Sequence, residues 1–369
     1  MDALDMIIDE FPHVTLLCFV LLGACIGSFL NVVIYRLPRG MSVQRPARSI
    51  CPRCGVPIPW YLNIPLVSWL QLRGRSACCG QPIAARYWLV ELCCALLFGG
   101  LAYVFLYEGV LPLLMMCGWG ACMLALLVMD WEEMVVHVPL ALVAAGFGLA
   151  AAGLDPLLVE PLAQQPWEGL LWGGVGALCG YAFFRLVALL GSLCLGRVKR
   201  VFSQPEPWCV RQVGEDIVLS VGGREYKWSE VFVESGARVE LAEAGAEQLA
   251  EAARGLVRLE EAALVLPGGV RRSLEDFERL SGTCSGVRIC RSVMGSGDPW
   301  LALAIGSLCG WQGVLFSLVA GSFIGLFAAL LMQVRRGQPM PFGPALVAAA
   351  LVWRFWGVQL VQAYLSLVS

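Results

Sequence analysis

An all-α polytopic membrane protein is the fold class that the sequence predicts, with about eight transmembrane helices, a cytoplasmic Cys-containing loop and an inserted soluble α+β domain. The first observation is composition: 58% of the 369 residues are hydrophobic and 15% are charged, whereas soluble domains carry about 25% charged residues. The second observation is a series of long apolar runs. The third is the gathering of polar residues into two segments between those runs, residues 35–87 and 197–292.

Eight apolar runs have a length near the roughly 20 helical residues that cross a bilayer. They are residues 14–34, 88–107, 111–129, 136–153, 169–195, 299–312, 313–333 and 344–366. The sixth run is short, and the turn "CGWQG" at 309–313 separates it from the seventh. The chain thus divides into five parts: residues 1–34 with the first helix, the loop at 35–87, helices two to five at 88–196, the inserted domain at 197–292 and the last three helices at 293–369.

Arginines set the expected orientation, because cytoplasmic loops of membrane proteins carry an excess of basic residues. The loop at 35–87 holds eight arginines and no acid, whereas the first ten residues hold four acids and no base. Eight alternating spans place the basic residues at 197–200 and 335–336 on the same side as this loop. We therefore expect the N-terminus outside and the loop in the cytoplasm, where its arginines also meet anionic membrane lipid.

Four of the 16 cysteines lie in this loop, at Cys51, Cys54, Cys78 and Cys79, whereas most of the others lie inside apolar runs. Buried cysteines of the second kind pack as small hydrophobic side chains. Disulfides do not persist in the cytoplasm, but "CPRC" is half of a zinc-ribbon pattern, in which two Cys pairs hold one zinc through their thiolates. The loop either binds zinc through these four residues or is metal-free and ordered by its arginines and prolines.

Two carboxylates are expected at the same membrane face. Asp130 ends the third apolar run and Asp298 begins the sixth. Each has a plain explanation, because an acid at a helix end is often solvated and one at a helix N-terminus is favoured by the helix dipole. Gly295 and Gly297, however, remove side chains where a substrate can approach. Two carboxyls that share a proton can activate a water and polarise a peptide carbonyl, so the pair is a candidate catalytic site.

The inserted block predicts a small domain of its own. Residues 216–221 and 226–234 have the pattern of a hairpin around "GG", and the segment from residue 242 has helical spacing, with Leu249, Ala253 and Val257 on one face. We find no glycine-rich phosphate loop, no histidine cluster and no basic stripe in it. A spacer or docking module is therefore expected here, with no nucleic acid as a partner.

Six motifs resemble those of the bacterial prepilin peptidases, the type IV leader peptidases that are membrane aspartic proteases of the GxGD type. They are "GSFLNVVIYRLPRG", "RSICPRCG", "NIPLVSWLQLRGR", "ARYWLVEL", "MGSGD" and "PFGPALVAAAL", in the family's order, and the resemblance covers about 1–195 and 291–369. Carried over by motif, the catalytic pair is Asp130 and Asp298. The resemblance implies cleavage of a short basic leader from type IV prepilins or type II secretion pseudopilins, at the cytoplasmic face of the bacterial inner membrane. It also implies N-methylation of the new N-terminus from S-adenosylmethionine, a step that the family links to the Cys loop.

The sequence departs from this family in several places. Pro139 comes nine residues after Asp130 with no Asp behind it, and Trp300 stands where the family often has Lys. The family has Cys at the position of Ser76, so Cys78 is the substitute fourth zinc ligand. An alternative function is a catalytically silent membrane scaffold or a transporter that retains this framework. A transporter, however, is expected to show repeat symmetry and acids at mid-membrane, and neither is found here.

Overall fold

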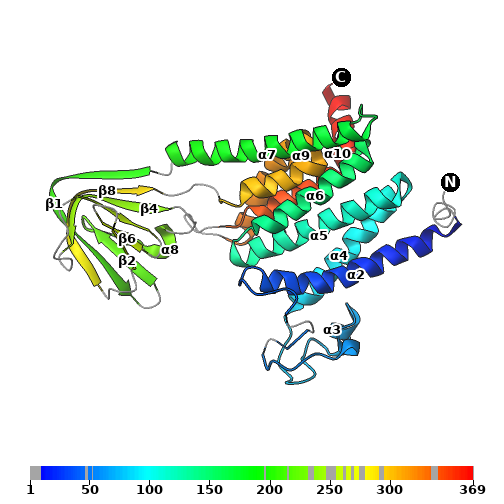
Figure 1. The fold of residues 1–369 in the computed structure, drawn as a ribbon, viewed down its shortest axis with the longest axis horizontal. Coiled ribbons are helices and arrows are strands. Elements are labelled where there is room, and N and C mark those ends of the chain that lie inside the picture. Colours follow the sequence, from blue (N-terminus) through cyan, green and yellow to red (C-terminus); the bar gives the residue numbers. More distant parts are fainter. Residues whose placement is uncertain are drawn as a thin grey trace. The chain divides into compact units, whose positions relative to one another are not determined.

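The computed structural model describes residues 10–45, 49–51, 53–194, 197–213, 216–231, 237–246, 255–260, 263–266, 270–273, 279–290, 295–333 and 340–368. Two compact units make up the chain. The first is helical and runs from the N-terminus to Ala182, resuming at Gly297; the second, Phe183–Ser296, holds the end of helix α7 and the strands (Figure 1). The labels below are those of Figure 1.

Long apolar helices form the first unit. They are α2 (Pro12–Arg36), α4 (Ala85–Phe105), α5 (Val110–Glu133), α6 (Val138–Leu154), α7 (Pro166–Cys194), α9 (Asp298–Leu331) and α10 (Gly343–Val368), with short 3₁₀ turns at Leu106–Glu108 and Pro156–Leu158. Within the described residues, five of them are long and apolar enough to cross a membrane, namely α2, α4, α5, α7 and α9, while α6 is a shorter apolar helix. The structure thus holds several candidate membrane-crossing helices, but a set of eight is not confirmed.

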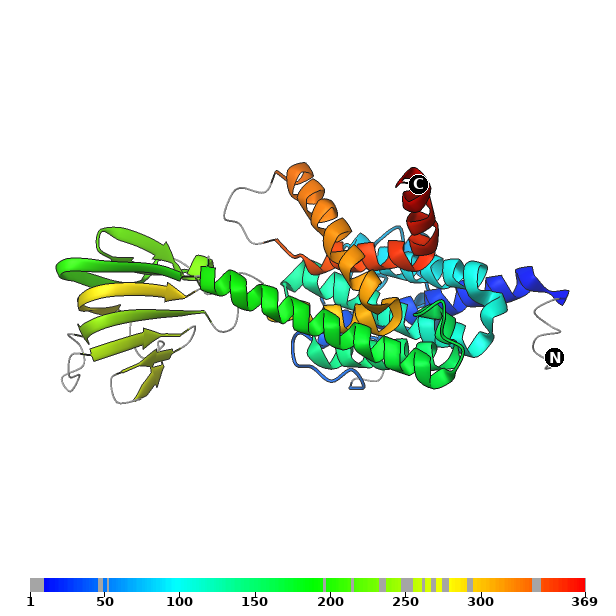
Figure 2. The ribbon, with the colours of Figure 1, turned by 90° about the horizontal axis from the view of Figure 1, so that it is seen from above.

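The predicted turn at 309–313 coincides with a sharp kink. The helical residues 298–331, labelled α9, are two helices that meet at Gly310, where φ is 64° and ψ is −177°, a non-helical conformation. Only glycine adopts such a conformation readily. The expected sixth and seventh spans are therefore the two halves of α9, and Figure 2 shows the change of direction between them.

Helices α5 and α9 contact each other deep in the helical unit. The indole Nε1–H of Trp119 donates to the carbonyl oxygen of Ala304 at 2.8 Å, and both residues are fully buried. This bond satisfies a buried polar group that apolar surroundings otherwise leave unpaired. It joins the two helices that carry the predicted acids.

The second unit is one antiparallel sheet of eight described strands. They are β1 (Arg197–Val213), β2 (Asp216–Val221), β3 (Arg224–Lys227), β4 (Arg238–Ala246), β5 (Gly255–Leu259), β6 (Ala263–Val265), β7 (Arg271–Ser273) and β8 (Arg279–Cys290), with a short helix, α8 (Trp228–Val231), after β3. Their order across the sheet is β3-β2-β1-β8-β4-β5-β6-β7. The expected hairpin is confirmed in part as β2 and β3, which turn at Gly222 and Gly223. Its second strand ends at Lys227, and residues 228–231, predicted as strand, form α8.

The helix predicted from residue 242 is wrong. Its described parts form β4, β5 and β6 instead, and Leu249 and Ala253 lie outside the described residues. Val257 and Leu259 alternate with exposed neighbours and are fully buried in the core of the sheet. So short a segment fits the helical period as well as the strand period, and pairing with β4 and β6 makes it a strand.

Candidate functional site

Asp130 lies inside the helical unit although it is close to the end of α5. Its side chain is buried, with 6% of its surface exposed. One carboxylate oxygen, Oδ2, accepts a hydrogen bond of 3.0 Å from the backbone N–H of Gly343, at the start of α10. A buried carboxylate needs such donors, because burial without them disfavours its charge. Asp130 is therefore not the solvated flank that its place at a helix end allows.

The two acids beside Asp130 have a different environment. Glu132 forms an ion pair with Arg86, and Glu133 pairs with Arg39 at 2.6 Å. Both carboxylates are partly exposed, and both arginines flank the Cys loop. These pairs explain Glu132 and Glu133 as contacts between the ends of α2, α4 and α5. They leave Asp130 as the one acid of the three that points into the protein.

Asp298 is the first residue of α9 and is also buried, with 7% of its surface exposed. Gly297 comes directly before it. A Cβ atom at Gly297 lies within 2.4 Å of the Cβ of Val136, a distance that no real contact shows. Gly297 is therefore required because the segment after α5 packs against the start of α9. Gly295 lies just before this contact and is partly buried.

Gly343 packs between Asp130 and the first turn of α9, which begins with Asp298. A Cβ atom placed on it lies 2.6 Å from Oδ2 of Asp130 and 3.2 Å from a methyl carbon of Leu301, which is one helical turn beyond Asp298. The end of α5 and the beginnings of α9 and α10 therefore converge, as Figures 1 and 2 show at one end of the helical unit. The sequence carried a signal for Gly343 in "PFGPALVAAAL", but its contact with Asp130 was not predicted.

An apolar pocket of about 110 Å³ lies next to this convergence. Its lining includes Trp131, which follows Asp130, and Pro344, which follows Gly343. Ile324 and Met340 line it as well. The recess thus lies beside the end of α5 and the start of α10, and its lining includes neither Asp130 nor Asp298.

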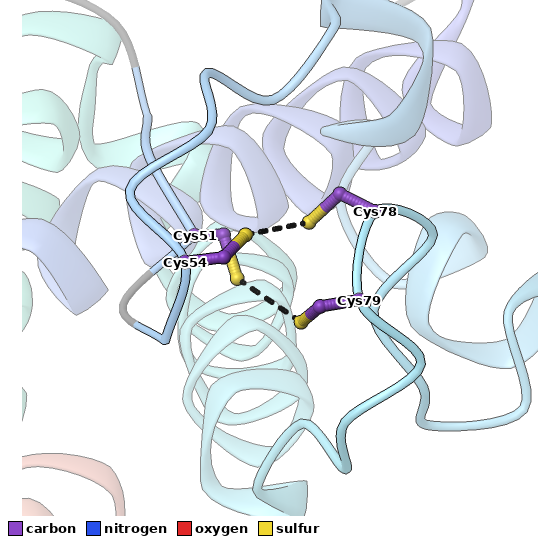
Figure 3. A group of neighbouring side chains, drawn as sticks. All are labelled: Cys51, Cys54, Cys78 and Cys79. Atoms are coloured by element: carbon purple, nitrogen blue, oxygen red, sulfur yellow. Dashed lines mark hydrogen bonds between the residues drawn. The ribbon is translucent and has the colours of Figure 1, made fainter.

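The four loop cysteines lie together (Figure 3). The Sγ atoms of Cys54 and Cys78 are 3.2 Å apart, those of Cys51 and Cys79 are 3.8 Å apart, and all four lie within 4.8 Å of one another. A zinc ion with four Zn–S bonds of about 2.3 Å needs sulfurs about 3.8 Å apart. The four side chains therefore fit one tetrahedral metal ion.

Two turns of the same design hold these cysteines. In the first, the N–H of Cys51 donates to Val56 and the N–H of Gly55 donates to Cys51, both at 2.9 Å. In the second, the N–H of Ser76 donates to Gln81 and the N–H of Gly80 donates to Ser76, both at 2.8 Å. Both glycines have positive φ, 72° and 67°.

"CPRCG" and "SACCG" are thus equivalent turns 25 positions apart, a repeat that the sequence analysis missed. Ser76 takes the place of Cys51 and Cys79 that of Cys54. The hydroxyl Oγ of Ser76 lies 3.6 Å from Sγ of Cys51 and 3.1 Å from Sγ of Cys78. Cys78 therefore brings its thiol beside the position that the missing cysteine leaves.

The thiols differ in acidity. The backbone N–H of Cys54 and the hydroxyl of Ser76 lower the pKa of the Cys51 thiol to about 6. For Cys54 the backbone N–H of Val56 lowers the pKa, but the hydrogen bond with Cys78 and burial outweigh it and raise the value to about 12. Hydrogen bonds to a thiolate favour its charge, so Cys51 is more ready than Cys54 to bind a cation.

Glu91 attaches this loop to the helical unit, a role that the sequence analysis did not assign. Its Oε2 accepts a hydrogen bond of 2.7 Å from the backbone N–H of Leu66. Leu66 has a φ of 63°, rare for a residue with a side chain, and it precedes the short helix α3 (Val67–Gln71). The carboxylate of α4 thus stabilises a strained turn in the loop.

Two family models match the chain. The Bacterial Peptidase A24 N-terminal domain matches residues 21–105, which include the four cysteines. The Type IV leader peptidase family matches residues 279–330, which include Asp298. Asp130 lies between the two matched segments.

Curated relatives agree with these models. A Prepilin leader peptidase/N-methyltransferase of Klebsiella pneumoniae is 38% identical over 50% of this chain and 86% of its own length. One of Aeromonas hydrophila is 28% identical over 94% of this chain and 92% of its own. One of Myxococcus xanthus is 40% identical over 49% of this chain and only 50% of its own. No solved structure matches the chain.

Proposed function

Because the chain belongs to the type IV leader peptidase family, we propose that it is a membrane aspartic endopeptidase that removes the leader from type IV prepilins or type II secretion pseudopilins. Its relatives carry the name Prepilin leader peptidase/N-methyltransferase, and the chain also N-methylates the new N-terminus from S-adenosylmethionine. The observation that carries the proposal is the burial of Asp130 and Asp298 at the converging ends of α5, α9 and α10.

Asp130 and Asp298 are the catalytic residues of this proposal. Two buried carboxyls at one site hold one proton between them, because like charges in a poorly solvated place do not both ionise. The ionised carboxylate takes a proton from a water molecule, whose oxygen bonds to the carbonyl carbon of the scissile peptide. The protonated carboxyl donates to the carbonyl oxygen. The C–N bond then breaks, and the leaving nitrogen takes up a proton to become the new N-terminus.

The hydrogen bond from Gly343 gives Asp130 a fixed position for this chemistry. General base catalysis needs the base within hydrogen-bond reach of the proton that it takes. The backbone donor uses one lone pair of Oδ2 and leaves the other carboxylate oxygen for the water. Gly343 is accordingly a positioning residue in the proposed site.

The expected orientation places this site at the cytoplasmic face of the bacterial inner membrane, with the N-terminus outside. The ion pairs of Arg39 and Arg86 support it, because they tie the arginine-rich loop to the same end of α5 that carries Asp130. The loop and the site thus share one side of the membrane. That side is the cytoplasm by the distribution of basic residues.

Zinc is the metal that fits the loop. Cys51, Cys54, Cys78 and Cys79 supply four sulfur ligands, and the hydroxyl of Ser76 lies within hydrogen-bond distance of two of the sulfurs, from outside the ligand set. A closed site with four thiolates stabilises a fold rather than activating water. The ion therefore orders the loop, and the peptidase chemistry remains with the two acids.

Purified protein incubated with a pilin-type leader peptide tests the proposal, with and without S-adenosylmethionine. We expect cleavage in both samples and methylation of the product in the second. Asp130→Asn and Asp298→Asn are each expected to abolish cleavage while the protein still inserts into membranes. Glu132→Gln is the matched control, because its carboxylate pairs with Arg86 at the surface. Normal cleavage by Asp130→Asn disproves the pair, and loss of cleavage in Glu132→Gln moves the assignment to that residue.

A further inference from the structure

One face of the sheet carries a cluster of basic side chains that the register brings together. Lys199 of β1 lies opposite Arg288 of β8, which lies opposite Glu240 of β4, which lies opposite Arg258 of β5. Arg238 is two residues before Glu240 and so points to the same face. We call Lys199, Arg238, Arg258 and Arg288 the basic face. It crosses four adjacent strands, about 5 Å apart each.

Glu240 lies at the centre of the basic face. Its carboxylate is nearly buried, and the guanidinium nitrogens of Arg238, Arg258 and Arg288 lie 3.3, 3.8 and 3.4 Å from it. Each of the three arginines is about half exposed. One acid balances only one of the four basic charges. The face therefore keeps an excess of three positive charges toward solvent.

The other side of the same strands is the core of the sheet. Val239, Leu241, Val257 and Ile289 alternate with the basic residues and are fully buried. The basic face is thus the outer side of a one-sided sheet. Val201 follows Lys199 at an interval of two and is 73% exposed, so an apolar side chain stands on this face as well.

Chain connectivity limits how far the basic face can lie from the membrane. The apolar part of α7 ends at Ser192, and Lys199 follows seven residues later. At a maximum of about 3.5 Å per residue, Lys199 lies within roughly 25 Å of the end of that helix. Arg288 is likewise ten residues before Asp298, where α9 begins. Strands β1 and β8, which carry Lys199 and Arg288, thus join apolar helices through short connections.

We propose that the basic face binds the headgroups of anionic phospholipids and docks the sheet on the membrane surface. Charge complementarity selects this partner, because a basic residue near an anionic bilayer changes the ratio of docked to free protein by about fivefold. The short connections allow the face to reach the headgroups of the membrane in which the same chain is embedded. The exposed Val201 adds an apolar contact at the interface. This proposal is independent of the peptidase activity.

The chain carries its own probes for a test, because lysine occurs only at Lys199 and Lys227. Lys199 belongs to the basic face, whereas Lys227 lies in β3 at the edge of the sheet. The full-length protein is placed in nanodiscs of phosphatidylcholine, or of phosphatidylcholine with phosphatidylglycerol, and labelled with a water-soluble amine reagent. We expect labelling of Lys199 to be at least about fivefold slower in the anionic discs at low salt. Labelling of Lys227, which is outside the basic face, is expected to change less.

Three variants identify the surface responsible. Arg258→Gln with Arg288→Gln removes two charges, so docking weakens by roughly 30-fold and the difference between the two lipids disappears. Glu240→Gln removes one negative charge, so the net charge of the basic face becomes more positive by one. We expect this variant to increase the difference in Lys199 labelling between the two lipid compositions. Arg272→Gln is the matched control, because Arg272 lies opposite the core residue Leu264 and so on the other side of the strands. In each variant the two lipid compositions are compared with each other.

Equal labelling of Lys199 in both lipids overturns the proposal. A difference that survives the double variant, or that Arg272→Gln also removes, assigns docking to another surface and overturns it as well. Cleavage of a soluble leader peptide, measured on the same samples, reports the proposed function separately. A protein that docks but does not cleave leaves the lipid proposal standing and disproves the peptidase.

Discussion

Replacing Gly343 with alanine is expected to displace the carboxylate of Asp130. The new Cβ lies 2.6 Å from Oδ2 and 3.1 Å from Cγ of Asp130, where real Cβ atoms stay beyond 3.0 Å. Leu301 lies 3.2 Å away on another side, so the alanine has no free direction into which to move. The carboxylate must shift by about half an ångström or more, and the 3.0 Å hydrogen bond from residue 343 is strained or lost.

A displacement of this size has a large effect on catalysis and a small one on folding. Misplacement of a reacting group by about 1 Å lowers a rate by about 100-fold, which corresponds to about 2.7 kcal/mol of transition-state stabilisation. We therefore expect kcat/KM for leader cleavage to fall by about 100-fold, mainly in kcat. Methylation of a peptide that already has a free N-terminus is expected to continue, because Gly343 lies in another part of the chain than the Cys loop.

Gly146→Ala is the matched control for this variant. No atom outside its own helix lies within 4 Å of a Cβ at Gly146 in α6, so the same chemical change meets open space. Cleavage and methylation are measured on both variants in detergent, with the unfolding temperature as a check on folding. A Gly343→Ala protein that folds and cleaves at the normal rate refutes the view that this contact positions Asp130. If the variant loses both activities because it does not fold, its lowered unfolding temperature reveals this.

Three further predictions concern the loop and the sheet. Cys78→Ser is expected to lose the bound zinc, which elemental analysis is expected to find at about one ion per chain in the parent protein. The double variant Cys78→Ser with Ser76→Cys is expected to regain the zinc. A double variant that stays metal-free contradicts the equivalence of the two turns. Zinc affinity, titrated against a competing chelator, is expected to fall as the pH is lowered through about 6. Protons then compete with zinc for the Cys51 thiolate, whose pKa is lowered to about 6 in the metal-free loop. An affinity that does not depend on pH between 5 and 7 contradicts this prediction. Replacing residues 197–290 with a Gly/Ser linker is expected to preserve leader cleavage. Both acids lie outside the sheet, and loop-closure entropy changes slowly with loop length. A shortened protein that is stable and inserts into the membrane but does not cleave shows that the sheet is part of the site.

A position of Asp130 and Asp298 at the same end of the helical unit could be predicted from topology, because the two predicted crossings between them return the chain to the same membrane face. Their burial could not. Asp130, Glu132 and Glu133 are neighbours in the sequence, and only the packing of α10 and the arginines beside the loop distinguishes them. Composition identifies an apolar helix, but it does not reveal which side of that helix faces protein rather than lipid.

The inserted block was harder to predict for a physical reason. Its apolar residues are short runs separated by charges, and such runs fit a helix or a strand equally well until a partner strand buries one side. The basic face could not be predicted from the sequence because it too depends on how the strands pair. No basic stripe occurs along the sequence, because Lys199, Arg258 and Arg288 come from three strands that only the sheet register places side by side.

The exchange of a ligand position in the Cys loop suggests how the proposed zinc site tolerates a sequence that departs from the family pattern. The second turn keeps the backbone hydrogen bonds and the positive φ of Gly80, so its geometry does not depend on the side chain at Ser76. Cys78 lies within this turn, two residues later, and its Sγ is 3.1 Å from the hydroxyl of Ser76. A thiol therefore reaches the vacant corner without a change in the backbone. The serine that remains contacts two sulfurs, Cys51 and Cys78, and a hydroxyl donor near thiolates stabilises their charge. We therefore expect Ser76→Ala to keep zinc bound but to weaken its retention at acid pH, a difference that the chelator titration measures directly.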